Sequence, residues 1–151
     1  MATLTPYLTV RDATVAIEFY RRAFGAVELM RMPSLDGQKV MHAHLKIGDS
    51  DLMLADEFPE MGGTRAPTTL GATSVTIHMS SPNVDQTMAT AAAAGAKVLM
   101  PPADMFWGDR FGILRDPFGH EWSIATTIRK MTPDQMRAAM PAVMSQQQHQ
   151  Q

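Results

Sequence analysis

One pattern, a strand followed by a helix and three more strands, occurs twice in this chain of 151 residues. No other feature restricts the possible folds as strongly. In each copy, a helical stripe of apolar residues ends at a glycine, Gly25 in the first and Gly95 in the second. The segments FYRRAFGAVEL and TMATAAAAGAKVL align with that glycine in register. We interpret the repeat as an internal duplication.

The first copy begins with alternating apolar residues that predict a strand over 5–10. Asp12 offers an N-cap for the helix that ends at Gly25. Turn residues then separate three further predicted strands, which span residues 26–31, 40–47 and 51–55.

The second copy repeats this order with a strand over 74–80 and a helix capped by Asn83 and Gln86. The turn Asp116-Pro117-Phe118-Gly119 has proline and glycine where a tight turn needs them. Three more predicted strands span residues 97–100, 110–115 and 120–126.

The boundaries of the expected units follow from these elements. Thr132 as N-cap and Pro133 in the first turn predict a final helix that Pro141 closes. We expect residues 1–128 to form one domain. Its parts and the segments after it are a first module (1–57), a linker (58–71), a second module (72–128), a C-terminal helix (129–144) and a flexible tail (145–151).

Charge, hydropathy and cysteine content exclude several functional classes. The net charge is −2 and the basic residues are scattered, so we expect no nucleic-acid or membrane partner. No apolar run approaches the roughly 20 residues that span a bilayer, and the N-terminus lacks a signal-peptide pattern, which predicts a cytoplasmic protein. The absence of cysteine excludes thiolate nucleophiles, disulfides and cysteine-based metal sites.

Three segments carry a family resemblance: TPYLTVRDATVAIEFYRRAFGA, HLKIGDSDLMLADE and MPPADMFWGDRFGILRDPFGHEW. With the duplicated unit, they resemble the vicinal oxygen chelate superfamily, which includes glyoxalase I, extradiol dioxygenases and bleomycin-resistance proteins, and more narrowly its PhnB-like subgroup. The resemblance implies an α+β fold in which two tandem βαβββ modules form a curled mixed sheet around a cavity. It also implies a homodimer.

The metal-dependent members of this superfamily hold a divalent ion with four inward-facing side chains. Alignment with the family places the four positions at Thr5, His44, Thr76 and Ser123. Only His44 is a good metal ligand, because neutral hydroxyls supply neither imidazole nitrogen nor anionic charge. We therefore expect no metal cofactor. A shift of two residues along a strand keeps the same face and leaves one alternative, a divalent-metal site of His42, His44, His78 and Glu121.

Further candidates come from the aromatic and basic cluster around Trp107 and Arg110, which can stack on and pair with a planar or anionic ligand. A core plug or a dimer interface explains this cluster equally well. Polar lining of a sheet is likewise an alternative role for His42 and His44. The nine candidate ligand-binding residues are Thr5, Tyr7, His42, His44, Thr76, His78, Trp107, Arg110 and Ser123.

Three functions follow from these candidates. The first is a metal-independent protein that binds a small apolar or aromatic molecule in the sheet cavity, as a drug-sequestering protein does. The second is a lyase or dioxygenase of the same superfamily that uses the alternative metal site, with Glu121 as ligand or base. The third is a dimeric scaffold whose cavity is filled by its own side chains.

Overall fold

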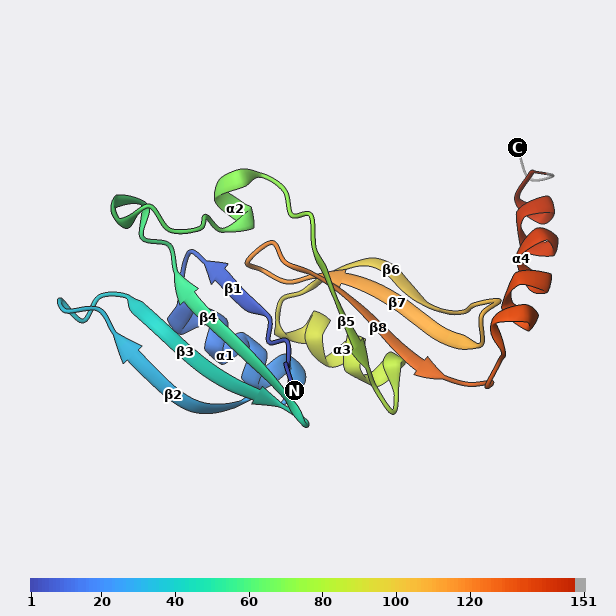
Figure 1. The fold of residues 1–151 in the computed structure, drawn as a ribbon, viewed down its shortest axis with the longest axis horizontal. Coiled ribbons are helices and arrows are strands. Elements are labelled where there is room, and N and C mark those ends of the chain that lie inside the picture. The colour runs from blue at the N-terminus through green and yellow to red at the C-terminus, as the bar shows by residue number, and fades with distance from the viewer. Residues whose placement is uncertain (149–151) are drawn as a thin grey trace.

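The computed structural model describes residues 1–148, with side chains described for residues 1–140. Its first module contains β1 (Tyr7–Val10), α1 (Ala13–Phe24), β2 (Val27–Pro33), β3 (Val40–Ile47) and β4 (Ser50–Asp56). Its second module contains β5 (Thr76–Ser80), α3 (Val84–Ala94), β6 (Lys97–Asp104), β7 (Asp109–Arg115) and β8 (Glu121–Thr127). Figure 1 shows the two modules side by side along the long axis of the molecule. The duplicated βαβββ order is confirmed.

The strands form two four-stranded mixed sheets, ordered β1-β4-β3-β2 and β5-β8-β7-β6. In each sheet the first strand of the module runs parallel to the last one, and the remaining pairs are antiparallel. The predicted α+β fold is therefore confirmed. The two sheets do not close into one sheet around a cavity, because within this chain they have no strand pairing with each other.

Both long helices begin and end as their sequences predict. The Asp12 carboxylate accepts the Val15 N–H at 3.2 Å, and Gly25 adopts the left-handed conformation, with φ of 69°. Asn83 caps α3 in the same way by accepting the Gln86 N–H at 3.1 Å. These caps place the buried stripe of each helix against one face of its own sheet.

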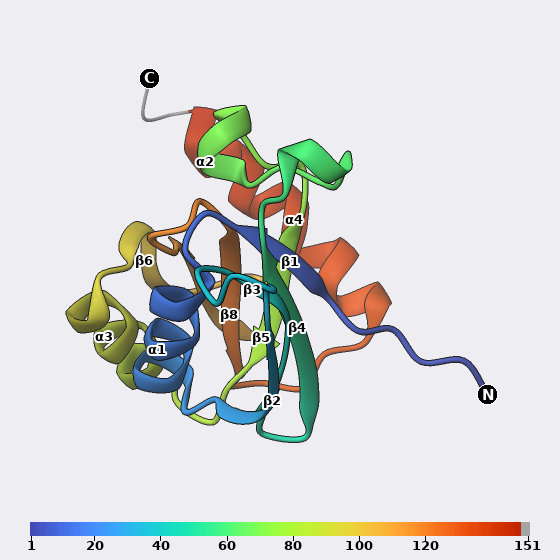
Figure 2. The same cartoon turned by 90° about the vertical axis from the view of Figure 1, so that its left-hand side faces the viewer.

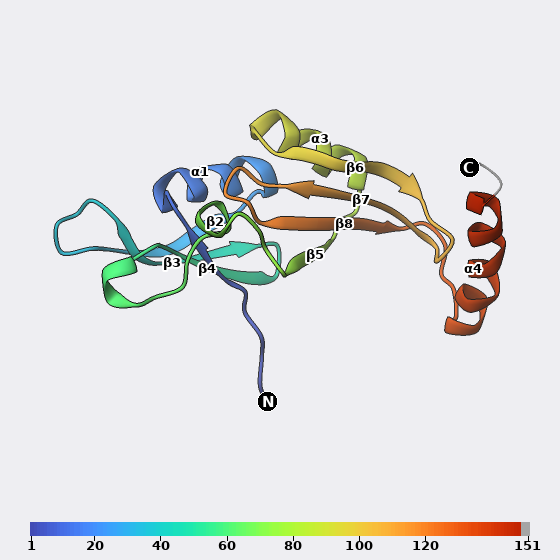
Figure 3. The same cartoon turned by 90° about the horizontal axis from the view of Figure 1, so that it is seen from above.

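The modules meet through α1 and α3, which lie side by side on one face of the molecule (Figures 2 and 3). Asp116 of the β7–β8 turn is 3% exposed and links the modules. One of its carboxylate oxygens accepts hydrogen bonds from Tyr20 of α1 at 2.5 Å and from the Trp122 indole at 2.9 Å. The other oxygen accepts the backbone N–H groups of Phe118 and His120. One hydrophobic core thus runs through both modules.

The structure differs from the sequence prediction in two segments. The connection predicted as an irregular linker contains a short 3-10 turn, η1 (Pro59–Met61), and a helical turn, α2 (Pro67–Leu70), whose Pro67 is buried. Helix α4 (Pro133–Gln148) begins at the predicted Thr132 cap, but it continues through Pro141. A proline inside a helix removes one backbone hydrogen bond, at a cost of about 3 kcal/mol, without always ending the helix.

The final helix lies beyond the second sheet, at the end of the molecule away from the first module (Figure 1). Residues 145–148 of the predicted tail are helical. Residues 149–151 lie outside the described residues. Among the helices of the described chain, none has the length and apolar character needed to cross a membrane.

Candidate functional site

Each sheet has one face covered by its helix and one open face, and strand alternation assigns the predicted residues to these faces. Tyr7, His42 and His44 lie on the open face of the first sheet. Their neighbours along the strands, Leu8, Ala43 and Leu45, point the other way and are buried in the core. Thr76, His78 and Ser123 lie on the open face of the second sheet by the same alternation with core residues. Thr5 precedes β1, and Trp107 lies in the β6–β7 turn. The predicted residues are thus divided between two faces.

Both histidines on the first open face have fixed partners. The Tyr7 hydroxyl lies 2.7 Å from Nδ1 of His42, and the two rings are 5.4 Å apart. Nε2 of His44 lies 3.0 Å from a carboxylate oxygen of Asp51 on the neighbouring strand β4. Each imidazole is therefore held through one ring nitrogen.

The second open face carries an aromatic cluster. His78 Nδ1 lies 2.8 Å from the Ser123 hydroxyl, and its ring stacks on Phe111 with centroids 6.4 Å apart. Trp107 packs edge-on against Phe111 at 5.4 Å and donates its indole N–H to Asp109 at 3.0 Å. The predicted residues Trp107, His78 and Ser123 therefore belong to one connected group.

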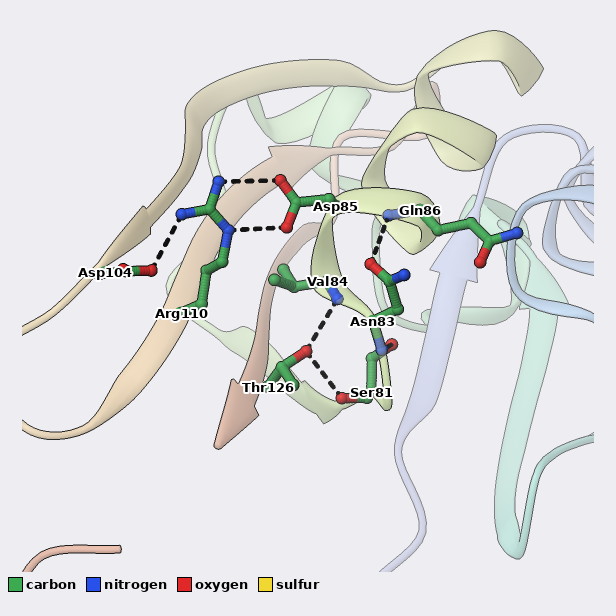
Figure 4. Close-up of polar contacts among 8 residues, drawn as sticks. All are labelled: Ser81, Asn83, Val84, Asp85, Gln86, Asp104, Arg110 and Thr126. Carbon is green, nitrogen blue, oxygen red and sulfur yellow. Dashed lines mark hydrogen bonds and ion pairs between the residues drawn. The ribbon is translucent and has the colours of Figure 1, made fainter. Parts of the chain in front are cut away.

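Arg110 does not share the open face with these residues. It lies two residues from the buried Gly112 and four from the buried Leu114, and so shares their face of the strand. This is the helix side, where Arg110 forms a two-point ion pair with Asp85 of α3 (Figure 4). A third bond joins it to Asp104 at 2.9 Å. Hydrogen bonds to Asp85 and Asp104 raise the pKa of Arg110 above its ordinary value. Its guanidinium joins α3 to the β6–β7 hairpin. The available sequence signal was weak, because Arg110 shares a face with Leu114 while the other face of the strand carries Phe111 and Ile113.

The alternative metal ligands are also divided. His42 and His44 lie in the first sheet, whereas His78 and Glu121 lie in the second, where Glu121 pairs with Arg115 at 2.9 Å. Among the described residues, no group of three or more His, Asp or Glu side chains is arranged to hold a metal ion. The chain by itself does not assemble this predicted set.

The duplication gives a second view of the aligned metal positions. Ser123 lies on β8 and pairs with His78 of β5, and the residue that holds the same place in the first module is Met53 of β4, which pairs with Tyr7. His44 lies one strand further, on β3. The position in the first module that is equivalent to Ser123 is therefore Met53, not His44. A thioether is a poor ligand for hard divalent ions.

A cleft of 1030 Å³ lies between the modules. Its walls come from the residues before β1, the C-terminal end of α1, the β3–β4 turn, strand β5 and the first turns of α3. Apolar side chains lining it include Phe24, Ile77 and Trp122, and Phe24 packs on Trp122 with ring centroids 4.8 Å apart. Polar side chains are at least as numerous in the lining, among them Arg22, Asp49, Asn83 and Gln86.

Of the nine predicted residues, Thr5 and His78 line this cleft. Sequence reasoning missed Asn83, Gln86 and Thr90, which lie on one side of α3, and the β3–β4 turn around Asp49. The available signal was the polar side of a helix whose other side is buried. No sequence pattern indicated that this polar side faces the first module.

Comparison with known proteins agrees with the duplicated fold. Residues 2–124 match the model of the glyoxalase/bleomycin resistance protein/dioxygenase superfamily. An uncharacterised protein of Mycobacterium bovis is 47% identical over 139 residues, which cover 91% of each chain. TioX from Micromonospora sp. ML1 is 26% identical, with a TM-score of 0.66 over 84% of this chain and 99% of that one. A PhnB protein from Bacillus cereus is 18% identical and shares the fold, with a TM-score of 0.62 over 83% of this chain and 99% of that one.

The family model covers both modules, and the structural neighbours share their arrangement. One family thus accounts for residues 2–124, from before β1 into β8. The chain belongs to the glyoxalase/bleomycin resistance protein/dioxygenase superfamily.

Proposed function

We propose that this protein binds a small apolar or aromatic molecule, without a metal, in the cleft between its modules. The observation that carries the proposal is the cleft itself, 1030 Å³ in volume, with aromatic side chains in its lining. Pockets for drug-sized ligands measure roughly 300–1,000 Å³ and are mostly apolar, with a few polar groups that fix orientation. The cleft also argues against the scaffold hypothesis, which requires the protein to fill its cavity with its own side chains.

The polar residues of the cleft suit an orienting role. His78 keeps its Nε2 free of the hydrogen bond to Ser123, which engages Nδ1. Asn83 and Gln86 add amide groups at the start of α3, and Thr5 adds a hydroxyl from the other module. Binding would bury the apolar part of the ligand against Phe24 and Ile77, which lie beside the core residue Trp122, while these groups fix its orientation. This mechanism is sequestration, and nothing in the described residues favours the lyase or dioxygenase over it.

The test is a screen of planar aromatic compounds for thermal stabilisation and for quenching of Trp122, in a Trp107→Phe background that leaves one tryptophan. Any ligand that binds only the folded protein raises the melting temperature. A bulky Thr90→Phe substitution in the cleft wall is expected to abolish both signals. Ala89→Phe on the neighbouring exposed position of α3, outside the cleft, is the matched control.

Two outcomes would contradict the proposal. In one, no compound of the panel stabilises the protein or quenches Trp122. In the other, Thr90→Phe and Ala89→Phe bind a ligand equally well, which would place the binding site outside the cleft.

The proposal extends to a homodimer of the PhnB-like kind. Support comes from the outer strands β2 and β6, where the duplication places Leu29 and Leu99 at equivalent bulges, 54% and 38% exposed. Exposed apolar side chains on both outer strands are typical of an interaction surface, and a second copy is the partner we propose. Sedimentation of wild type against Leu29→Glu tests this proposal. A wild-type monomer at micromolar concentration would contradict the homodimer.

The cytoplasmic location of the protein stays a prediction.

A further inference from the structure

Two methionines and two histidines form a square on the open face of the first sheet. In the β2–β3 ladder, Met30 lies directly opposite His44, and Met32 lies directly opposite His42. Residues opposite one another share a face of the sheet, with Cβ atoms about 4.5–5.5 Å apart. Residues two apart along a strand share that face too. All four side chains therefore project from the same side.

The methionines of this square are unusually accessible. Met30 is 43% exposed and Met32 is 52% exposed, although a thioether gains free energy when it is buried. Met53 extends the first row, because it pairs with His44 on the side away from Met30. Thioethers thus lie on both sides of His44 and on one side of His42, and their rotatable side chains can adjust to an ion.

Each imidazole of the square is oriented by a partner outside it. Tyr7 holds Nδ1 of His42 and Asp51 holds Nε2 of His44, so the other nitrogen of each ring is left for a ligand. Histidines that bind metals almost always have their second ring nitrogen bonded to such a partner, often a carboxylate. The His44–Asp51 pair has this arrangement at 3.0 Å.

We propose that Met30, Met32, His42 and His44 form a binding site for a soft monovalent metal ion, Cu(I) or its analogue Ag(I). Thioether sulfur selects soft ions, and imidazole suits copper. The same set is a poor site for Mn²⁺, which prefers oxygen ligands, and for Zn²⁺, because only two of its four groups are the thiolate, imidazole or carboxylate ligands that zinc sites use. The four side chains do not line the cleft between the modules, although Asp51 does, so loss of ion binding and loss of ligand binding in the cleft are measured separately.

Competition with a chromophoric Cu(I) chelator, under ascorbate and without oxygen, measures stoichiometry and affinity on the full chain. We expect one Cu(I) per chain and no measurable Zn²⁺ binding at the same protein concentration. A double substitution, Met30→Leu with Met32→Leu, keeps the apolar volume and removes both sulfurs. It is expected to lower the affinity by more than the roughly tenfold to hundredfold typical of a lost outer partner.

The matched control replaces Met61 and Met140 by leucine, since these methionines are also exposed, at 66% and 47%, and lie outside the square. We expect this control to bind Cu(I) as the wild type does. Equal affinity of the two double variants would overturn the proposal, because the copper would then be held by scattered thioethers. Failure of the wild type to compete with the chelator would overturn it too.

Asp51→Asn tests the orienting role of the carboxylate. We expect a tenfold to hundredfold loss of Cu(I) affinity, the range typical of outer partners, with an unchanged circular dichroism spectrum. The ¹³C resonances of the Met30 and Met32 methyl groups should shift on addition of Ag(I) in wild type. Shifts confined to other methionines would place the ion elsewhere and contradict the assignment.

Discussion

The two modules share one plan but solve the same packing problems with different residues. Where the first module has Ala43 under its helix, the second has Gly112, and where the first helix presents Ile17, the second presents Met88. A smaller sheet residue is matched by a longer, more flexible helix residue. The volume under the helix is thus shared between its two contributors, and a duplicated fold tolerates divergence when both change together.

The turns between the last two strands differ more deeply. In the first module the turn at Gly48 and Asp49 is exposed. In the second module the turn carries Asp116, which is buried against Tyr20 of the first module, and Phe118, which packs against Phe19. Burial and the nearby Asp116 carboxylate raise the pKa of Tyr20 well above its ordinary value. One copy of the turn thus joins the modules, and the other contributes to the wall of a cleft.

The largest expected effect comes from breaking this difference between the turns. Asp116→Ala removes the acceptor of the buried Tyr20 hydroxyl and Trp122 indole, and of the Phe118 and His120 backbone N–H groups. Since each stranded buried donor costs about 1–3 kcal/mol, the two side-chain donors alone predict a loss of roughly 2–6 kcal/mol in the free energy of unfolding, measured by urea denaturation.

Asp49→Ala in the exposed turn is the control, with an expected change within about 0.5 kcal/mol. If both substitutions cost the same, Asp116 does not link the modules as its contacts indicate.

A smaller effect is expected from exchanging the packing pair. A Cβ at residue 112 would lie 2.3 Å from the Met88 sulfur, so Gly112→Ala overpacks the space under α3. We expect a loss of about 1–3 kcal/mol. Adding Met88→Ile gives the second module the pair found in the first, and it should recover part of that loss.

Thermal and urea unfolding of the two single variants and the double variant form the measurement, a double-mutant cycle. Strictly additive effects would mean that Gly112 and Met88 do not compensate one another. A Gly112→Ala variant as stable as wild type would mean that the methionine moves aside without cost.

The smallest expected effect concerns the ion pair found only in the second module. The hydrogen bonds from Arg110 hold the pKa of Asp85 below its ordinary value of 3.8. Folding lowers the pKa of Asp85, so the ion pair stabilises the fold at pH values above the ordinary pKa of 3.8. This contribution is lost as the pH falls through the lower, folded-state pKa. Arg110→Met should therefore lose less stability than wild type as the pH falls from about 5, roughly one unit above the ordinary pKa, to below 3.8.

The first module supplies the comparison here as well, since Met41 holds the place of Arg110 in its β3 strand. Unfolding curves at several pH values, at low and high salt, measure the effect, and salt should reduce it because both side chains are partly exposed. An acid dependence identical in wild type and Arg110→Met would contradict the role given to this pair.

Local patterns were sufficient to predict most of the fold. The caps at Asp12 and Asn83, the glycines that end both helices and the turn at Asp116 each depend on a few neighbouring residues, and the structure confirms them. The end of α4 was predicted wrongly at Pro141, because one proline weakens a helix by an amount that other helix-forming residues can offset.

Which face each side chain occupies was only partly decided by sequence. Alternation along a strand separates two faces but does not say which one a helix covers, so Arg110 was placed with the candidate ligands although it lies beside α3. Arg110 shares a face with Leu114, but Phe111 and Ile113 make the other face apolar too, so the sequence did not show which face is buried. His42 and His44 were correctly grouped with each other, but their methionine neighbours were not foreseen.

The sequence by itself determined the duplicated modules, because helix caps, turns and hydrophobic periodicity depend on residues that are close together in the chain. Only the tertiary structure decided what lies between and across the strands. The register of β2 on β3, shifted by bulges, places Met30 opposite His44, and the packing of α1 against α3 opens a cleft beside His78. Both depend on contacts between residues far apart in the chain, which no local pattern specifies.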